Sequence, residues 1–481
     1  MKPRKQNNRV PMYMQLANLL EGMIQGRSLR PGDRVPSVRQ FSLQQRVSVP
    51  TALQAYTLLE TRHLIEARPK SGFFVRARVA DLVPAPKSPA GVQKTMEFTE
   101  VDPLDVLLED RAGARLTPLG LAVPAPDLLP GVKLARTLAA VARKLGPSGA
   151  AYDEAAGAEA LRTEIARRSL QWGCALKPDD LVITVGATEA LSLALRAVCQ
   201  PGDSIVVEAP TYFGITRMAH DLGLRALPVV VDSDHGIDVE ALKKTLRDHR
   251  VAACVLTPNF HNPVGFAMAD ERKKHVIEML SRRRVPLIED DVYGDLPHAG
   301  PRPRCMKAFD ASDSVILCGS YSKTLAPGYR IGYIAAGRWR KAVLDLKRSA
   351  SLSGPLLLNL AAAEFLRNGG YDRYLRHVRQ IYGEQIARMK EAVVDCFPKG
   401  IRLSRPRGGF LLWCELPPAV DSIKLFHSAR AAGISIAPGP LFCPRGGFRH
   451  FIRLNCGQTW NAQMERSIGI LGHLARKIEK S

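Results

Sequence analysis

Two stretches near the start of the chain carry apolar side chains at helical spacing. The first has them at positions i, i+3, i+4, i+7 and i+8 and predicts one buried helix face, made by Leu16, Leu19, Leu20, Met23 and Ile24. The second has them at i, i+3, i+4 and i+7, with polar residues on its other side, and the apolar positions are Ala52, Ala55, Tyr56 and Leu59. Ser37 and Ser48 are of a type that caps helices. We therefore expect a short middle helix after Ser37 and the later helix after Ser48, with Pro50 in its first turn.

Two short strand-like runs come next, Leu64–Arg68 and Phe73–Arg76. The intervening segment Pro69–Gly72 predicts a hairpin with a basic tip. Three helices and a basic hairpin make a winged helix-turn-helix, in which the third helix enters the major groove of DNA and the wing meets the backbone. A chance three-helix bundle is the alternative.

From about residue 117 the pattern changes to strand-like runs that alternate with helical ones, which predicts an α/β sheet with crossover connections. The candidate strands are Leu181–Val185, Ser204–Glu208, Ala252–Thr257, Pro286–Asp290 and Val315–Gly319. Between the two patterns lies a Pro/Ala stretch, Val83–Ala90, which predicts an interdomain tether. We therefore expect a DNA-binding domain over 1–78, a linker over 79–116 and a second domain over 117–481, whose large part covers about 135–350 and whose small part covers about 351–481.

Positive charge is concentrated at the start of the chain. The net charge is +22, and residues 1–78 carry +10 of it, with 14 Lys/Arg against 4 Asp/Glu. A generally basic protein does not account for this gradient, whereas double-stranded DNA does. The composition, with 46% apolar and 24% charged residues, is that of a globular protein. No apolar run reaches the roughly 18–20 residues that span a bilayer, and no signal peptide is recognisable, so we expect a cytoplasmic protein. The nine scattered cysteines indicate free thiols and no metal site.

The first 78 residues resemble the GntR-type DNA-binding domain along their whole length. The resemblance lies in Pro31–Arg39 (PGDRVPSVR), in the helix that follows Val47, and in the Ser-Gly-x-x-Val of the hairpin. It implies that the following residues contact DNA: Arg39, Ser48, Pro50, Thr51, Gln54 and Lys70. Val49 and Leu53 stand where members of this family often carry arginine. Base readout is therefore expected to use apolar contact together with Thr51 and Gln54, and most single contacts are expected to reach phosphates.

A loop rich in hydroxyl groups, Gly319–Arg330 (GSYSKTLAPGYR), follows one of the predicted strands. In an apolar cleft the pKa of Lys323 would fall, and its neutral amine could form a Schiff base with an aldehyde. Ser320, Ser322 and Arg330 are donors of the kind that bind a phosphate. A solvated surface loop is the alternative. The string Ser-x-Ser-Lys-Thr-x-Ala-Pro-Gly-x-Arg resembles the pyridoxal phosphate (PLP) loop of fold-type I aminotransferases.

Other strand ends carry residues that suit the same cofactor, although each has an ordinary alternative. The Gly186 turn opens a helix and, with Thr188, could bind a phosphate or simply serve packing. Tyr212 could stack on a flat ring or belong to the core. Asn262, in an Asn-Pro-x-Gly turn, could bond a phenolic oxygen or cap the turn. One of the acids in Glu289–Asp291 could keep a pyridine nitrogen protonated, or all three are strand-end acids.

The order of these motifs resembles aminotransferases related to kynurenine and 2-aminoadipate transaminases, from about Leu116 to the C-terminus. The resemblance implies that Lys323 forms the Schiff base. It assigns the other cofactor contacts to Asp290 on the pyridinium nitrogen, Tyr293 and Asn262 on the ring oxygen, Tyr212 on the ring face, and Ala187, Thr188, Ser320, Ser322 and Arg330 on the phosphate. Tyr152 matches a tyrosine that reaches the partner subunit's phosphate, which implies a homodimer. Arg453, in the run Phe451–Asn455, would bind an effector carboxylate, with a surface ion pair as its alternative.

With both resemblances in one chain, the sequence as a whole resembles the MocR subfamily of bacterial transcriptional regulators. They imply a multidomain chain with an N-terminal winged helix-turn-helix and a PLP-dependent aminotransferase fold of type I, which has a large mixed-sheet domain and a smaller α+β domain. The expected function is a regulator that senses PLP or an amino compound. It would act as a homodimer, head-to-tail, with swapped DNA-binding domains, and would not serve as an enzyme in the cell. The alternatives are a working aminotransferase with an attached DNA-binding domain and an inert dimerising domain.

Overall fold

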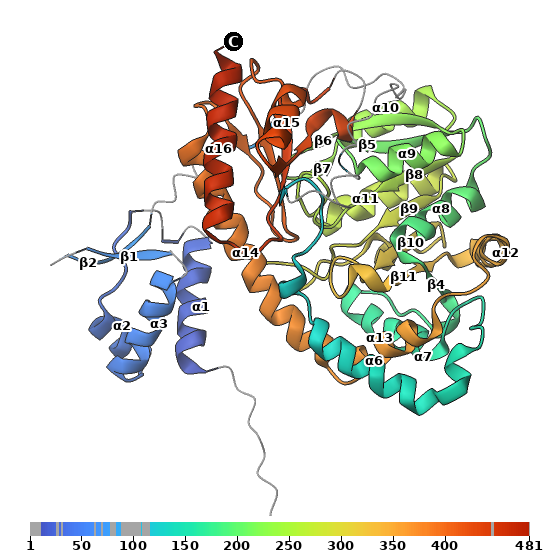
Figure 1. The fold of residues 1–481 in the computed structure, drawn as a ribbon, viewed down its shortest axis with the longest axis horizontal. Coiled ribbons are helices and arrows are strands. Elements are labelled where there is room, and N and C mark those ends of the chain that lie inside the picture. Colours follow the sequence, from blue (N-terminus) through green and yellow to red (C-terminus); the bar gives the residue numbers. More distant parts are fainter. Residues whose placement is uncertain are drawn as a thin grey trace, which may run out of the picture. The chain divides into compact units, whose positions relative to one another are not determined.

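The chain divides into two units, Met1–Val83 and Pro84–Ser481, which we call the N-terminal and C-terminal units. The structure is a computed structural model (Figure 1). It describes residues 11–25, 28–29, 32–61, 64–68, 71–76, 83–87, 107, 116–443 and 447–480. Within these ranges, no helix is both long enough and apolar enough to cross a bilayer.

The N-terminal unit is the predicted winged helix-turn-helix. Its elements are α1 (Met12–Gln25), α2 (Val38–Gln44), α3 (Val49–Thr61), β1 (Ile65–Arg68) and β2 (Gly72–Val75). The two strands are antiparallel, with Arg68 opposite Gly72. Both predicted caps are present, because the hydroxyl of Ser37 accepts from the Gln40 amide at 3.2 Å and that of Ser48 accepts from the Thr51 amide at 3.3 Å. The apolar face predicted for α3 is fully buried.

The face predicted for α1 is partly wrong. Leu16 and Leu20 are buried as expected, but Leu19 and Met23 are 46% and 39% exposed. Ala17 is completely buried in their place. A helix that packs mainly on one neighbour, here α3, buries a narrow stripe, and the small Ala17 lies closer to the centre of that stripe than the larger residues at its edge.

The C-terminal unit is built around a mixed sheet of eight strands in the order β4-β11-β10-β9-β8-β5-β6-β7, which we call the large sheet (Figure 1). The strands are β4 (Leu181–Thr184), β5 (Ser204–Ala209), β6 (Arg225–Asp232), β7 (Gly236–Ile237), β8 (Ala253–Leu256), β9 (Leu287–Asp290), β10 (Val315–Ser320) and β11 (Gly332–Ala335). Those from β10 to β6 run parallel, whereas β11 is antiparallel to both its neighbours. All five predicted strands are confirmed, and the structure adds β6, β7 and β11.

Helices cover both faces of the large sheet, so its strands are buried on both sides. In β4, Val182 packs into the core cluster beneath α8, while its neighbour Ile183 packs into the cluster beneath α7. The helices around the sheet are α6 (Gly131–Leu145), α7 (Glu159–Ser169), α8 (Gly186–Val198), α9 (Phe213–Asp221), α10 (Val239–Asp248), α11 (Asp270–Arg282), α12 (Arg340–Ala350) and α13 (Leu356–Arg367).

A smaller α+β part follows the long helix α14 (Gly370–Cys396). Its four-stranded sheet, the small sheet, has the order β12-β13-β16-β15 and packs with the two last helices (Figure 1). Its strands are β12 (Arg402–Leu403), β13 (Leu411–Glu415), β15 (Ala437–Pro438) and β16 (Phe451–Asn455), and its helices are α15 (Ser422–Ala431) and α16 (Ala462–Glu479). A separate parallel pair joins β14 (Ile434–Ser435) to β3 (Thr117–Pro118), which ties the start of the aminotransferase-like region to the small part.

Candidate cofactor site and DNA-binding surface

Lys323 lies just beyond the carboxyl end of β10, on the loop that returns to β11. Its Nζ donates a hydrogen bond to the carbonyl oxygen of Ala122 at 2.5 Å. The neighbouring strand β9 is parallel and in register, with Asp290 beside Cys318. Because parallel strands end at a common edge of the sheet, the predicted lysine and the predicted acid are brought together there.

A cradle of hydrogen-bond donors lies beside this loop. Arg330 Nη1 donates to Ser322 Oγ at 3.3 Å, and Nη2 donates to the carbonyl oxygen of Val185 at 3.1 Å. Ser320 Oγ lies 2.9 Å from Ser322 Oγ. Arg330 has a left-handed backbone with φ of 53°, which is uncommon for a residue with a side chain and is found where the surroundings enforce it. The guanidinium and the two hydroxyls thus surround one point at the end of β10.

The first turn of α8 forms the other side of the cradle. Gly186 has φ of 79°, and a Cβ at this position would lie 2.6 Å from Arg330 Nη2. Only glycine therefore allows the helix to begin this close to the guanidinium. The amides of Ala187 and Thr188 belong to the first turn, where backbone N–H groups have no partner within the helix. A cation, two hydroxyls and a helix N-terminus together suit a phosphate dianion.

Glu189 supports this cradle and was not selected from the sequence. Its Oε2 accepts from the Val185 amide at 2.5 Å, and its Oε1 accepts from Ser351 Oγ at 2.6 Å. Lys347, which is fully buried, places its Nζ 3.6 Å from Glu189 Oε2. The sequence signal that could have identified Glu189 is its place as an acid in the first turn of a helix. Its side-chain partners Ser351 and Lys347 are about 160 residues away in sequence, so no local pattern connects them to it.

Of the three consecutive acids at the end of β9, Asp290 is distinguished by its surroundings. Both oxygens of Glu289 accept backbone amides, those of residues 306 and 307, at 2.6 and 2.9 Å. Asp291 forms a buried ion pair with Arg302. Asp290 Oδ1 is buried, and no hydrogen-bond partner is present among the described residues. Burial, followed by the charges of Asp291 and Glu208, raises the pKa of Asp290 to about 7, and only Lys323 opposes this shift.

The residues predicted to contact the ring oxygen lie next to the predicted carboxylate-binding arginine. Arg453 is fully buried; its Nη1 donates to Asn262 Oδ1 at 2.9 Å, and its Nη2 donates to the carbonyl oxygen of Gly120. Burial lowers the pKa of Arg453 to about 10. Tyr293 is buried as well, and within the described chain its hydroxyl has no partner. The partners found for Arg453 are an amide and a carbonyl oxygen, so the alternative of a surface ion pair does not describe it.

Tyr212 completes the site from the start of α9. Burial raises its pKa, and its phenol also feels the charges of Asp290, Arg453 and Arg330, which shows that it lies near all three. A Cβ at Gly214 would lie 2.4 Å from the Tyr212 ring, so glycine is needed for the ring to adopt this position. The tyrosine is therefore held within the predicted site.

These residues fit pyridoxal phosphate. The cradle suits its phosphate, and the buried, unpartnered Asp290 and Tyr293 oxygens suit the protonated nitrogen and the phenolic oxygen of its ring. Lys323, just beyond the end of β10, supplies the amine that would react with the aldehyde of the cofactor. Tyr152 is 86% exposed in the single chain.

The predicted DNA-contacting residues lie on α2, α3 and the turn between them. All those that the structure describes are exposed or half-buried, namely Arg39, Ser48, Pro50, Thr51 and Gln54. Lys70 lies outside the described residues. Ser48 caps α3, and its hydroxyl lies 2.7 Å from Thr51 Oγ1, so this pair is engaged within the protein as well. The apolar residues Leu43, Val49 and Leu53 on the same helices are 79%, 46% and 49% exposed.

Both parts of the chain match known families. Residues 12–75 match the bacterial regulatory proteins of the gntR family, and residues 119–471 match the class I and II aminotransferases. The chain is 38% identical to the Escherichia coli HTH-type transcriptional regulator YjiR, over 92% of this chain and 94% of YjiR, and 35% identical to YdcR of the same organism, over 97% and 99%. The solved structure of α-aminoadipate aminotransferase LysN from Thermus thermophilus, complexed with N-(5'-phosphopyridoxyl)-L-leucine, matches with a TM-score of 0.73 and 26% identity. The match covers 79% of this chain and 95% of LysN.

Fold and site thus define an aminotransferase-like domain of fold type I joined to a winged helix-turn-helix, and the predicted cofactor, pyridoxal phosphate, is confirmed by the family assignment. The HTH-type transcriptional regulators that this chain resembles align with it over more than nine tenths of both chains. The chain belongs to the MocR subfamily of GntR-type transcriptional regulators.

Proposed function

We propose that this protein is a transcription factor that holds pyridoxal phosphate covalently through the Lys323 amine and changes its DNA binding according to whether PLP or an amino compound is bound. The observation that carries the proposal is Asp290. A buried carboxylate whose pKa is raised to about 7 by burial and nearby acids, with one oxygen unpartnered, is costly unless a ligand completes it.

The residues of the site would divide the work of binding. When bound, PLP supplies an electron sink and an aldehyde carbon. Asp290 would hold a proton on the pyridine nitrogen, and Arg330 with the first turn of α8 would neutralise the phosphate. Arg453 would bind a carboxylate of the effector with both Nη groups, and to do so it would exchange its present contact with Gly120.

We further propose a cytoplasmic homodimer, arranged head-to-tail with swapped DNA-binding domains, in which the exposed Tyr152 reaches the phosphate in the partner subunit's site. For such a dimer to regulate, the ligand must bind one arrangement of the two DNA-binding units better than the other.

A working aminotransferase is the second candidate, because the lysine, the acid and both arginines needed for that chemistry are in place. Purified protein supplied with pairs of amino acids and 2-oxoacids distinguishes the two. Brisk multiple turnover would favour the enzyme, whereas at most slow turnover together with a PLP-dependent change in DNA affinity would favour the regulator.

The proposal is tested with Lys323→Ala. The variant should lose the visible absorbance of bound PLP, and borohydride reduction followed by mass spectrometry should find the pyridoxyl group on Lys323 of the wild type. Affinity for the DNA upstream of the protein's own gene should be retained without PLP, because the predicted DNA-contacting residues lie in the N-terminal unit. Lys341→Ala is the matched control, since this lysine is 90% exposed and forms a surface ion pair with Asp345. Equal loss of DNA binding in the absence of PLP would contradict the proposed separation of roles.

A further inference from the structure

The first residues of the C-terminal unit, Pro84–Lys87 of the predicted linker, are fixed to the small sheet. The carbonyl oxygen of Pro84 accepts from the Leu403 amide at 3.0 Å, on the edge strand β12. The Lys87 amide donates to Glu415 Oε2 at 2.8 Å, at the end of β13. Two hydrogen bonds within four residues, one to a backbone amide and one to a side-chain carboxylate, therefore hold this segment against the edge of the small sheet.

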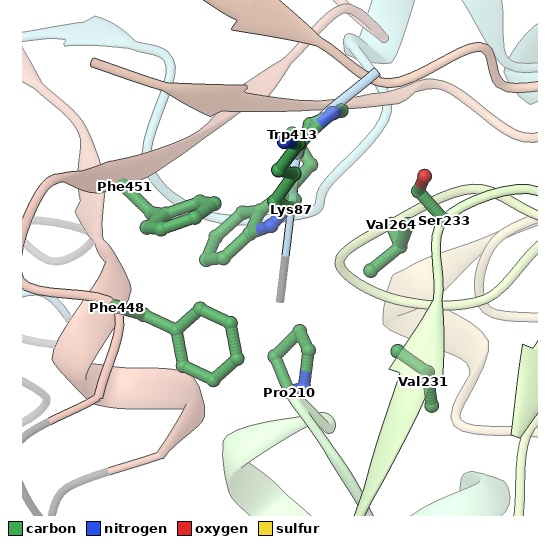
Figure 2. A pocket seen from close by; sticks show the side chains of 9 residues that line it. Lys87, Pro210, Val231, Ser233, Val264, Trp413, Phe448 and Phe451 are labelled. Atoms are coloured by element: carbon green, nitrogen blue, oxygen red, sulfur yellow. The ribbon is translucent and has the colours of Figure 1, made fainter. Parts of the chain in front are cut away.

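Between these two anchors Pro86 is buried, and it borders a pocket that is also lined by both parts of the C-terminal unit. Figure 2 shows this pocket. The large part contributes Pro210, Val231, Ser233 and Val264, and the small part contributes Trp413, Phe448 and Phe451. We call this set the linker pocket. Pro86 and Lys87 of the segment complete its lining, and the space left between all these residues is about 10 Å³, at most the room of one water molecule.

The linker pocket lies one layer of side chains away from the cofactor site. On the small sheet, Trp413 stands opposite Arg453. The ring of Phe442 connects them, because its centroid is 5.2 Å from that of Trp413 and 5.0 Å from Arg453 Cζ. On the large part, Pro210 precedes Tyr212 by two residues, and the intervening Thr211 donates its amide to the Phe442 carbonyl oxygen at 3.2 Å. A ligand that fixes Tyr212 or draws on Arg453 therefore acts directly on both walls of the linker pocket.

We propose that the linker pocket senses the cofactor site and that its occupant, Pro84–Lys87 of the same chain, is held more firmly when PLP is bound. PLP stacked on Tyr212 would immobilise the wall that Pro210 forms, and a more rigid wall opens less often. In the sequence, this segment follows directly on the N-terminal unit. Its docking would thus restrict that unit in one ligand state and not in the other. This inference rests on the proposed function, because it requires PLP to bind at Lys323.

The pocket can be tested with a pair of matched variants. Pro86→Glu would place a carboxylate among aromatic rings and close to Glu415, where burying a charge is costly. Pro84→Glu adds the same charge and removes the same residue type, but the Pro84 side chain is exposed and only its carbonyl oxygen is used. Any general effect of linker charge or flexibility is therefore shared by the two variants.

Hydrogen exchange of the Lys87 and Leu403 amides, followed by mass spectrometry with and without PLP, measures the docking directly. In the wild type and in Pro84→Glu, PLP should slow both amides by at least about fivefold, the low end of ordinary coupling between sites. In Pro86→Glu both amides should exchange fast in either state, while the visible absorbance shows that PLP still binds. DNA affinity, measured in parallel, should respond to PLP in the wild type and in Pro84→Glu but not in Pro86→Glu.

Unchanged exchange at Lys87 in wild-type protein that has bound PLP would overturn the inference, even if DNA affinity responds to PLP. An equal PLP effect on DNA affinity in both variants would overturn it as well. If exchange changes while the DNA affinity of the wild type is indifferent to PLP, the pocket senses the cofactor and the proposed regulatory function fails instead. The two proposals can thus be refuted separately.

Discussion

In protein without PLP, Asp290→Asn should change the free energy of unfolding more favourably at pH 8 than at pH 5. The pKa of Asp290 is raised from its ordinary value of 3.8 to about 7 by burial and by the nearby Asp291 and Glu208. Between these two values the unfolded chain has lost the proton while the folded chain still holds it. Folding therefore becomes less favourable as the pH rises from about 4 to 7, and the full penalty is present above pH 7. Asparagine cannot ionise, so the variant avoids this penalty.

The size of the effect follows from the shift in pKa. One pKa unit corresponds to 1.36 kcal/mol, so a shift of about three units amounts to about 4 kcal/mol between pH 4 and pH 8. The asparagine amide has its own cost of about 1–3 kcal/mol when buried without partners, but this cost does not depend on pH. We therefore compare the difference in Tm between variant and wild type at one pH with the same difference at another pH. About two of the three units fall between pH 5 and 8, which is about 3 kcal/mol. For a unit of about 400 residues this corresponds to about 3 °C in Tm.

The assay is thermal unfolding of both proteins after removal of PLP, at pH 5, 6, 7 and 8, with the difference in Tm plotted against pH. The difference should rise by about 3 °C in favour of Asp290→Asn toward pH 8. Asp295→Asn is the control. Burial opposes ionisation of Asp295, but Arg302 and Arg168 outweigh it and lower its pKa below the ordinary value of 3.8. The stability that Asp295 contributes is therefore constant from pH 5 to 8 and falls only below about pH 4, so the Tm difference for Asp295→Asn should be flat across the assay. A flat difference for Asp290→Asn would refute the reasoning that Asp290 is an uncompensated acid awaiting a ligand.

Two further predictions concern the two binding surfaces. Arg39→Ala should weaken DNA binding, which fluorescence anisotropy measures between about 50 and 200 mM salt. If Arg39 contacts a phosphate, the slope of log K against log salt should become smaller in magnitude by about one. An unchanged affinity would mean that this end of α2 does not face DNA. Gly186→Ala should lower PLP affinity by at least about tenfold in absorbance titrations, because its Cβ would lie 2.6 Å from Arg330 Nη2 in a backbone conformation with φ of 79°. Gly328→Ala is the control, since nothing lies within 4 Å of a Cβ there, and equal affinities of the two variants would argue against the cradle.

Much of the fold could be predicted because local pattern and tertiary environment agree. The caps at Ser37 and Ser48, the buried face of α3 and five strands of the large sheet are confirmed. The strands that were missed have weaker signals. The residues of β11, Gly332–Ala335, directly follow the lysine loop and cannot be separated from it by pattern, and β6 contains Pro228, which lowers strand propensity. The small sheet includes two strands of only two residues, too short for any periodicity.

The site was predicted as a set of residues, but the role of each depends on distant partners. The sequence alone offers Glu289, Asp290 and Asp291 as equivalent acids. They differ only because backbone amides satisfy the first, Arg302 pairs with the third, and nothing in the described chain satisfies one oxygen of the second. Glu189 was missed for the same reason, since Ser351 and Lys347 reach it through the packing of α12 on α8. Partnerships between residues that are far apart in sequence leave no local pattern.

The cost of Asp290 also bears on how an aminotransferase-like site could drive a regulator. A ligand can shift an equilibrium between two arrangements only by the free energy with which it prefers one of them. Supplying a protonated nitrogen to Asp290 would recover up to about 4 kcal/mol by the same conversion of its pKa shift, more than the 1–3 kcal/mol of ordinary allosteric coupling. This free energy is released beside Tyr212 and Lys323, next to the wall of the linker pocket that Pro210 forms. If the proposed function holds, the acid that aminotransferases use in catalysis would supply, in this chain, part of the free energy that holds the linker.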